Sequence, residues 1–150
     1  MDPVFEAYFE VLEALHEGCQ SQISGLTQEE LDWCPNDEMN SVAVLATHIA
    51  GAERYWIGDV VMEEASGRNR DKEFSTNGVS EDVLLGLLDA ALSYTREAFS
   101  RLATDHLAEL RISPRDGREY TVAWSIAHVL EHTALHLGHM QITGHLLKSR

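Results

Sequence analysis

The chain has 150 residues, 44% of them hydrophobic, and its 11 basic and 25 acidic residues give a formal net charge of -14. This length and apolar fraction are typical of one globular domain with its own core. We therefore expect a single domain over residues 1–150. A strongly negative chain is repelled by phosphate backbones and anionic lipid headgroups, which argues against nucleic acids and membrane surfaces as partners.

The N-terminal segment carries acidic residues where a signal peptide would carry basic ones. No apolar run approaches the roughly 20 residues that a membrane-spanning helix needs. We therefore expect a cytoplasmic protein. Cys19 and Cys34 are too few for a disulfide framework and lack the C-x-x-C spacing of a zinc or redox site. We interpret both as reduced thiols with a packing role.

Hydrophobic periodicity predicts four long helices. Apolar residues recur at spacings of three and four along these segments, which is the pattern of a helix with one buried face. Acidic residues open the third segment and arginines occupy its later half, as the helix dipole favours. The predicted helices cover residues 2–23, 40–65, 80–103 and 124–147. His16 lies near the end of the first of these helices, and we interpret it as a solvated histidine or one at the edge of the core.

The connecting segments carry turn signals. Thr27 followed by Glu30 resembles a capping box and predicts a short helical start after the first long helix. Residues 66–80 are the most polar stretch of the chain and are interpreted as a surface loop. A proline and an Asp-Gly pair separate two short extended pieces within residues 107–124, which predicts a small hairpin or an irregular crossover.

These elements predict an all-α fold. Four helices of similar length, each with an apolar face, pack most simply as a four-helix bundle. Such bundles build metal and cofactor sites from side chains on facing helices. Polar residues on the inner helix faces are therefore the candidates for chemistry.

The last predicted helix holds five of the eight histidines. His128, His132 and His136 follow one another at intervals of four residues, and each interval turns by only about 40° around the helix axis. The three side chains therefore share one face. His139 falls on the same side, whereas His145 points elsewhere. Buried imidazoles are cut off from water, so they need hydrogen-bond partners or a metal ion.

His48 lies deep in the second predicted helix among apolar neighbours, so we expect its side chain to face the core. A lone buried histidine is usually a hydrogen-bonded core residue. Here, however, the H-x-x-x-H pair of His132 and His136 lacks a third partner, and three neutral imidazoles can bind Zn²⁺ with an open fourth position. Spacing alone leaves two alternatives, a metal site and a buried hydrogen-bonded histidine cluster. The glutamate of an H-E-x-x-H motif is absent.

Two stretches carry a family resemblance. LATHIAGAERYWIGD, around His48, contains the pattern H-x-x-x-x-E-R-x-W, and HVLEHTALHLGH contains the pattern HxxxH. Both resemble motifs of the DinB-like superfamily of four-helix proteins, which includes bacillithiol S-transferases and mycothiol-dependent maleylpyruvate isomerase. The resemblance spans nearly the whole chain. It implies a DinB-like bundle with a metal triad at His48, His132 and His136, which holds Zn²⁺ or Ni²⁺ at the open end of the bundle, and it implies a homodimer.

The chain departs from the family pattern at Leu137 and His139, where many relatives carry a basic residue and glutamine. The contacts of those side chains are therefore changed here. We interpret His128 mainly as a packing residue, with a metal-supporting or a substrate-facing role as the alternatives. Glu53 and Glu131 point away from the ligand directions of the neighbouring histidines, and we interpret them as solvated or interhelical partners rather than catalytic bases.

The expected function is that of a metal-dependent enzyme. A divalent ion at the histidine triad would bind a low-molecular-weight thiol or water, lower its pKa and present it to an electrophilic small molecule. The resemblance implies S-transfer, whereas the residues themselves do not choose between an S-transferase and a hydrolase. The alternative from another class is a non-catalytic metal-binding or stress-related binding protein with a structural histidine cluster.

Overall fold

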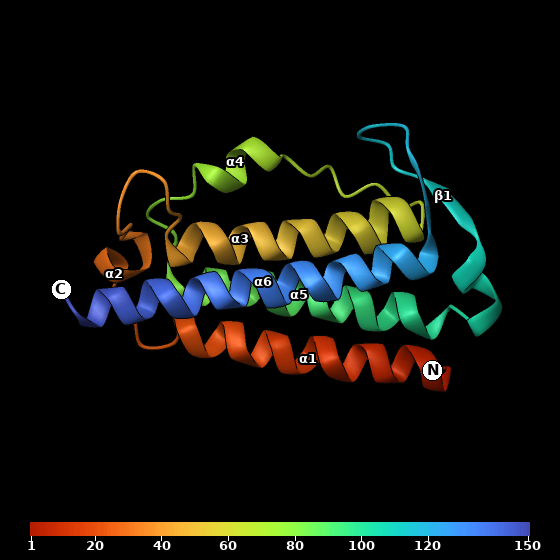
Figure 1. Ribbon diagram of the computed structural model, residues 1–150, viewed down its shortest axis with the longest axis horizontal. Coiled ribbons are helices and arrows are strands. Elements are labelled where there is room, and N and C mark those ends of the chain that lie inside the picture. Colours follow the sequence, from red (N-terminus) through yellow and green to blue (C-terminus); the bar gives the residue numbers. More distant parts are fainter.

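The computed structural model describes residues 1–150 and contains four long helices that pack side by side (Figure 1). The long helices are α1 (Pro3–Ile23), α3 (Val42–Glu53) with its direct continuation, the π-helix η1 (Arg54–Val61), α5 (Glu81–Ser100) and α6 (Val122–Lys148). The shorter elements are α2 (Gln28–Asp32), α4 (Arg70–Phe74), the 3₁₀ helix η2 (Thr104–Ala108), β1 (Leu110–Ile112) and β2 (Glu119–Thr121). The predicted all-α four-helix bundle is confirmed.

The order of the helices in space requires one long connection. Helices α1 and α3 each pack against both α5 and α6. In Figure 1, α3 and α5 run in the same direction, opposite to α1 and α6. Because a parallel pair cannot be joined by a tight turn, residues 62–80 return along the outside of α3 and carry α4 with them (Figure 1).

Side-chain caps mark where three of the long helices begin. Asp2 accepts a hydrogen bond from the backbone of α1, and Ser41 does the same for α3. Thr121 caps α6 by accepting from Trp124 N at 3.1 Å, so this helix begins two residues before the predicted Trp124. Such caps satisfy backbone N–H groups that have no partner within the helix.

The predicted hairpin forms at the end of the bundle where α6 begins. Strands β1 and β2 pair antiparallel, with Leu110 opposite Thr121 and Ile112 opposite Glu119. The buried hydroxyl of Ser113 lies 2.7 Å from the hydroxyl of Tyr55 in η1. This hydrogen bond ties the hairpin to the bundle.

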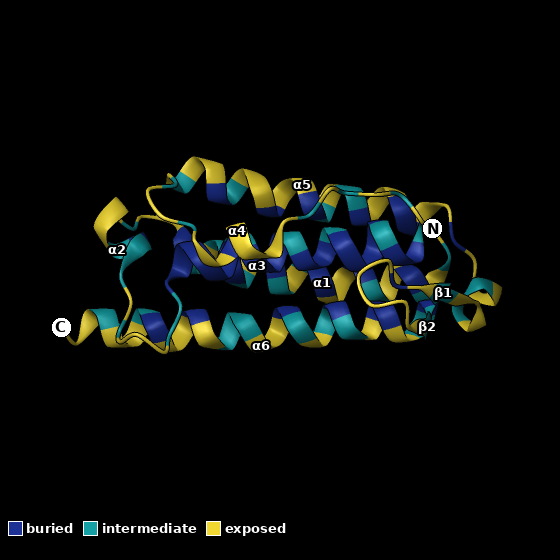
Figure 2. Cartoon of the chain, turned by 90° about the horizontal axis from the view of Figure 1, so that it is seen from above, coloured by how far each residue is buried: buried dark blue, intermediate teal, exposed yellow.

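Two hydrophobic clusters fill the interior, and Figure 2 shows that the buried residues line the inner faces of the long helices. Each fully buried leucine, isoleucine or phenylalanine stabilises the fold by about 1.5–3 kcal/mol. Large members of the cluster nearer the hairpin are Phe5, Phe9, Trp56, Phe99 and Ile126. Large members of the second cluster, which lies farther from the hairpin, are Ile23, Leu45, Ile49, Leu84 and Leu88.

A buried polar layer separates the two clusters. His16 on α1 pairs with Glu53 on α3, and the hydroxyl of Thr95 on α5 donates to the same carboxylate at 2.6 Å. All three residues are at most 1% exposed. The sequence interpretation of His16 as solvated or at the core edge is therefore wrong, because the carboxylate that pairs with its Nε2 comes from another helix. Glu53 is an interhelical partner, but it is not solvated.

The two cysteines differ in environment. Both are free thiols, and Cys19 is buried in the second cluster, as expected for a packing residue. Burial, with a smaller contribution from the Glu53 carboxylate, raises the pKa of the Cys19 thiol to about 12, so this thiol stays protonated near neutral pH. Cys34 is exposed, and the packing role expected for it is wrong.

No helix of the chain combines the length and apolarity that crossing a membrane requires.

Replacing Glu53 with alanine should destabilise the fold by about 3–5 kcal/mol, because removal of one member of a buried pair leaves the other uncompensated. Chemical denaturation followed by circular dichroism measures this loss. The matched control is Glu13→Ala, because Glu13 pairs with Arg96 at the surface at 3.0 Å and exposed ion pairs contribute only about 0–1 kcal/mol. Equal losses in the two variants would show that the buried layer contributes no more than a surface pair.

Candidate metal centre

Three histidines from two helices come together between α3 and α6. His48 Nε2 lies 3.0 Å from His132 Nε2, and the His136 ring centroid lies 4.4 Å from that of His132. One ring nitrogen from each of the three residues lies within 4.8 Å of the other two. The structure therefore brings together the three histidines that the sequence assigned to one site. Their binding of a metal stays a prediction.

A carboxylate orients His48. Glu73 Oε2 lies 2.8 Å from His48 Nδ1, and both side chains are buried. An ionised carboxylate only accepts hydrogen bonds, so we assign the proton to Nδ1, and Nε2 presents its lone pair toward His132. Metal-binding histidines commonly use their second nitrogen in this way.

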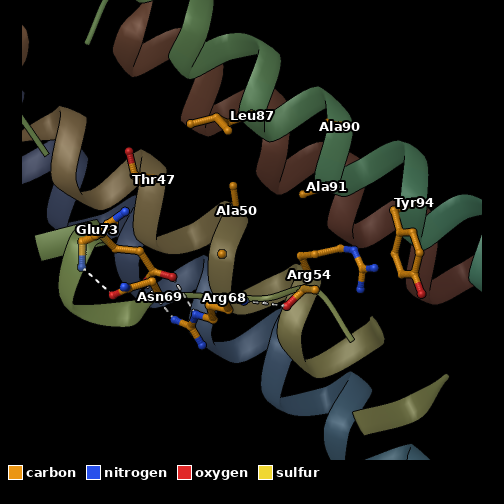
Figure 3. A pocket seen from close by; sticks show the side chains of 13 residues that line it. Thr47, Ala50, Arg54, Arg68, Asn69, Glu73, Leu87, Ala90, Ala91 and Tyr94 are labelled. Carbon is orange, nitrogen blue, oxygen red and sulfur yellow. Dashed lines mark hydrogen bonds and ion pairs between the residues drawn. The ribbon is translucent and has the colours of Figure 1, made fainter. Parts of the chain in front are cut away.

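Arg68 holds Glu73 in place (Figure 3), and Gly51 leaves room for it. Arg68 Nε donates to Glu73 Oε1 at 2.6 Å and Arg68 Nη2 donates to Oε2 at 2.9 Å, a two-bonded pair. A Cβ at Gly51 of α3 would overlap Glu73 Oε1, so only glycine leaves room for this carboxylate. Burial opposes ionisation of Glu73, but the hydrogen bonds from Arg68 and His48 keep its pKa below its usual value.

The interpretation of residues 66–80 as a surface loop misses this contribution. Residues 70–74 form α4, which places Glu73 at 5% exposure and the Phe74 ring 4.8 Å from the His48 ring. A local signal was available, because Asn69 is a helix-capping residue and Phe74 is an apolar residue within a polar stretch. That signal does not show which side chain Glu73 contacts, because His48 is 25 residues away in the sequence.

His132 and His136 are neutral near pH 7. Burial, followed by repulsion among the neighbouring imidazoles, lowers the pKa of His132 to about 3 and the pKa of His136 to about 4. Because metals bind the neutral imidazole, the environment favours the protonation state that a metal site needs.

His128 belongs to a row of stacked rings. Its ring stacks on Trp124 with centroids 4.9 Å apart, and Trp124 stacks on Tyr120 with centroids 4.4 Å apart. The His128 centroid is 5.7 Å from that of His132, and burial lowers the pKa of His128. Glu131 approaches His128 Nδ1 only to 3.5 Å and is 66% exposed. The packing interpretation of His128 and the solvated interpretation of Glu131 both agree with the structure.

The two departures from the family pattern have separate environments. Leu137 packs against the second hydrophobic cluster, and a Cβ at Gly18 of α1 would overlap its side chain. His139 is exposed, and its Nδ1 lies 3.3 Å from His136 Nδ1. Leucine at position 137 therefore contributes to helix packing, whereas His139 adds an imidazole at the edge of the cluster.

The donor set fits a divalent transition metal. At a tetrahedral zinc ion, two nitrogens that each lie about 2.1 Å from the metal are about 3.4 Å apart. The ring nitrogens here lie within 4.8 Å of one another, so the imidazoles would move closer together on binding an ion. The cluster contains only imidazoles, which suit zinc, copper, iron and nickel. Three protein ligands would leave a coordination position open for a small molecule.

The fold and the site define a four-helix-bundle protein with a long crossover and a histidine cluster between α3 and α6. A family model described as mycothiol-S-transferase matches residues 7–147. The chain belongs to this family, and the predicted DinB-like relationship is confirmed. No curated protein matches the chain significantly.

Solved structures support the fold. A conserved protein from Enterococcus faecalis is similar with a TM-score of 0.83 and 15% identity over 100% of this chain and 99% of that chain. A DinB-like protein from Bacillus cereus ATCC 10987 has a TM-score of 0.75 and 18% identity over 92% and 89% of the two chains. YfiT from Bacillus subtilis, described as a probable metal-dependent hydrolase with an unusual four-helix bundle topology, has a TM-score of 0.76 and 16% identity over 96% and 87%.

The free energy of unfolding of the chelator-treated protein should fall as the pH is lowered from about 7 to about 5. Histidines of the unfolded chain bind protons with a pKa near 6.5, whereas folded His132 and His136 bind them only near 3 and 4. The unfolded state therefore takes up more protons over this interval, which lowers stability. Urea denaturation at several pH values measures the slope.

The control for this slope is the double variant His132→Gln and His136→Gln, which removes both titrating groups. Its stability should change less with pH over the same interval. An unchanged slope in the double variant would show that these two histidines do not resist protonation in the folded protein.

Proposed function

We propose that this protein is a metal-dependent S-transferase that uses mycothiol or a related low-molecular-weight thiol. The observation that carries the proposal is the cluster of three imidazoles in a member of the mycothiol-S-transferase family. A divalent ion, Zn²⁺ or Ni²⁺, held by His48, His132 and His136 would lower the pKa of a thiol or water bound beside it and so supply a nucleophile near neutral pH.

The surrounding residues prepare the site for such a ligand. Glu73 accepts a hydrogen bond from His48 Nδ1, and the lone pair of His48 Nε2 therefore stays available to bind a metal ion. Arg68 neutralises Glu73, so the buried carboxylate is compensated from two sides. These contacts orient the site before any ligand arrives, which reduces the reorganisation that binding requires.

The row of stacked rings that runs from β2 into α6 offers a surface for the electrophile. Tyr120, Trp124 and His128 form a continuous series of rings that leads from the hairpin to His132. Trp124 is 45% exposed, so a planar or apolar group can lie against it. We propose that the electrophile lies along this row while the thiol lies at the histidine cluster.

Metal-assisted hydrolysis is the second candidate. YfiT, which shares this fold, is described as a probable metal-dependent hydrolase, and an activated water at the same three histidines would make this chain a hydrolase instead. The two reactions differ in whether a thiol is consumed, so one assay separates them. A non-catalytic metal-binding protein is the outcome that remains if neither reaction occurs.

Three further expectations stay proposals. A single domain over residues 1–150 and a cytoplasmic location are carried over from the sequence. A homodimer is carried over from the family resemblance. The homodimer is supported by exposed apolar side chains on α6, which are Leu135, Ile142 and Leu146, exposed by 50%, 51% and 43%.

The metal-binding step is tested with three variants of matched design. His48→Ala should abolish tight binding of Zn²⁺ or Ni²⁺, whereas Glu73→Gln should weaken it by about 10-fold to 100-fold, as loss of a group that orients a ligand typically does. Glu131→Gln is the control and should bind like the native protein. Competition with a chromophoric chelator measures each affinity.

Melting curves give a second reading of the same series. At free metal 100 times its Kd, a metal that binds only the folded state stabilises it by about 2.7 kcal/mol, so native protein should melt at a lower temperature after chelation. The His48→Ala variant should show no such shift. An equal shift in the native and His48→Ala proteins would remove His48 from the site.

The reaction itself is tested with metal-loaded protein, a thiol and a model electrophile. Mycothiol should be conjugated faster than the uncatalysed rate, and both chelation and the His136→Ala change should abolish the acceleration. Bacillithiol and glutathione serve as comparison thiols, and chromatography with mass detection measures the conjugate. Ester or amide cleavage without thiol consumption would favour the hydrolase, and no reaction of either kind with metal bound would favour a binding protein.

A further inference from the structure

A cavity of about 600 Å³ lies between α3, α5 and the crossover that covers them (Figure 3). None of the three clustered histidines lines it, but Arg68 and Glu73 do. The cavity and the histidine cluster therefore share one ion pair and have separate interiors. Its volume falls within the range of small-molecule sites, which is about 300–1,000 Å³.

The cavity has an apolar floor and wall. Its floor is open because α3 and α5 present small residues to each other at this level, and Leu87 and Tyr94 extend the wall along α5 (Figure 3). The small residues are Ala50, Gly51, Ala90 and Ala91. Apolar surface of this kind fits the hydrocarbon or aromatic part of a ligand.

The lining is positively charged although the whole chain carries a net charge of -14. Arg54, Arg68 and Lys72 line the cavity, against the single carboxylate of Glu73. Glu73 is already bound by Arg68 and His48. The lining groups therefore sum to an excess of positive charge.

The three cations differ in how far they are neutralised. Arg68 is paired with Glu73. Arg54 lies 3.8 Å from Asp59 and also 3.8 Å above the Tyr94 ring, where it closes one end of the cavity. Lys72, on α4, makes no ion pair. Its ammonium group is the available partner for an acidic ligand.

We propose that this cavity is a second binding site, distinct from the histidine cluster, for a small amphipathic anion. The acidic group of the ligand is neutralised by Lys72 at the crossover, and its apolar part lies over the alanines of α3 and α5 and against Leu87. A carboxylate or sulfonate next to apolar surface needs such a countercharge, and the excess positive charge of the lining supplies it. The inference is independent of the S-transferase proposal, because it needs neither a metal nor a reaction.

Binding is tested with two fluorescent probes that share their rings and differ in charge. 8-Anilinonaphthalene-1-sulfonate is the amphipathic anion, and N-phenyl-1-naphthylamine is the neutral analogue. The native protein should bind the sulfonate saturably, with one site per chain and more tightly than the neutral probe. Saturable binding that is absent, or that is equal for the two probes, would overturn the proposal.

The charge is tested by Lys72→Gln. This change should weaken binding of the sulfonate by about fivefold, which is the upper limit for a solvent-accessible charge pair. The affinity for the neutral probe should stay within about twofold of the native value, because that probe carries no charge for Lys72 to pair with. Lys148→Gln, which removes an exposed lysine at the end of α6, is the matched control. Equal weakening by the two substitutions would show that net charge, and not this cavity, attracts the probe.

The location is tested by Ala90→Phe, which places a large side chain at the exposed edge of the cavity. Ser93→Phe, on an exposed position of the same helix outside the lining, adds a similar bulk elsewhere. Only Ala90→Phe should abolish binding of both probes. Retained binding in Ala90→Phe would overturn the proposal. Circular dichroism and melting curves verify the fold of each variant, and Lys72→Gln decides the question if Ala90→Phe does not fold.

Discussion

The carboxylate of Glu73 connects the parts of this molecule on which its chemistry depends. It accepts from His48 on one side and from Arg68 on the other, and Gly51 leaves the space that it occupies. This one group sets the proton position on His48, draws the crossover onto the bundle and closes one wall of the α3–α5 cavity. A buried carboxylate is costly without partners, so the ion pair and the histidine orientation stabilise each other.

The topology explains why this carboxylate comes from a crossover. A parallel α3–α5 pair requires the chain to return along the whole bundle, and that return runs along the outside of α3 (Figure 1). Segments forced to cross a bundle in this way can contribute side chains to sites that the four long helices form. Here α4, only five residues long, supplies Glu73 to the histidine cluster and Lys72 to the cavity.

Charge is distributed unevenly between surface and interior. The chain is strongly acidic, yet His132 and His136 are neutral because burial and repulsion from neighbouring imidazoles lower the pKa of each. The cavity lining carries excess positive charge, and the layer of His16, Glu53 and Thr95 is satisfied almost entirely by its own members. The net charge therefore indicates which molecules the protein surface attracts or repels, and it does not indicate the charge of either candidate site.

The sequence by itself determined the four helices, the bundle class and the shared face of His132 and His136. These features follow from local geometry, because a spacing of four residues places two side chains on one helix face whatever the helix packs against. His48 was identified as the third member through its apolar surroundings and the H-x-x-x-x-E-R-x-W motif. The hairpin was predicted from its turn residues, although the same residues also allowed an irregular crossover.

Only the tertiary structure decided which polar groups meet. His48 and Glu73 are 25 residues apart, His48 and His132 are 84 apart, and His16 and Glu53 are 37 apart. No periodicity links such positions, because their contact depends on which helices become neighbours and on the path of the crossover between them. For this reason local patterns predict a surface loop at Glu73 and the edge of the core for His16, although both side chains are buried and paired. The cavity likewise arises from two facing rows of small residues, which become a space only when α3 and α5 pack together.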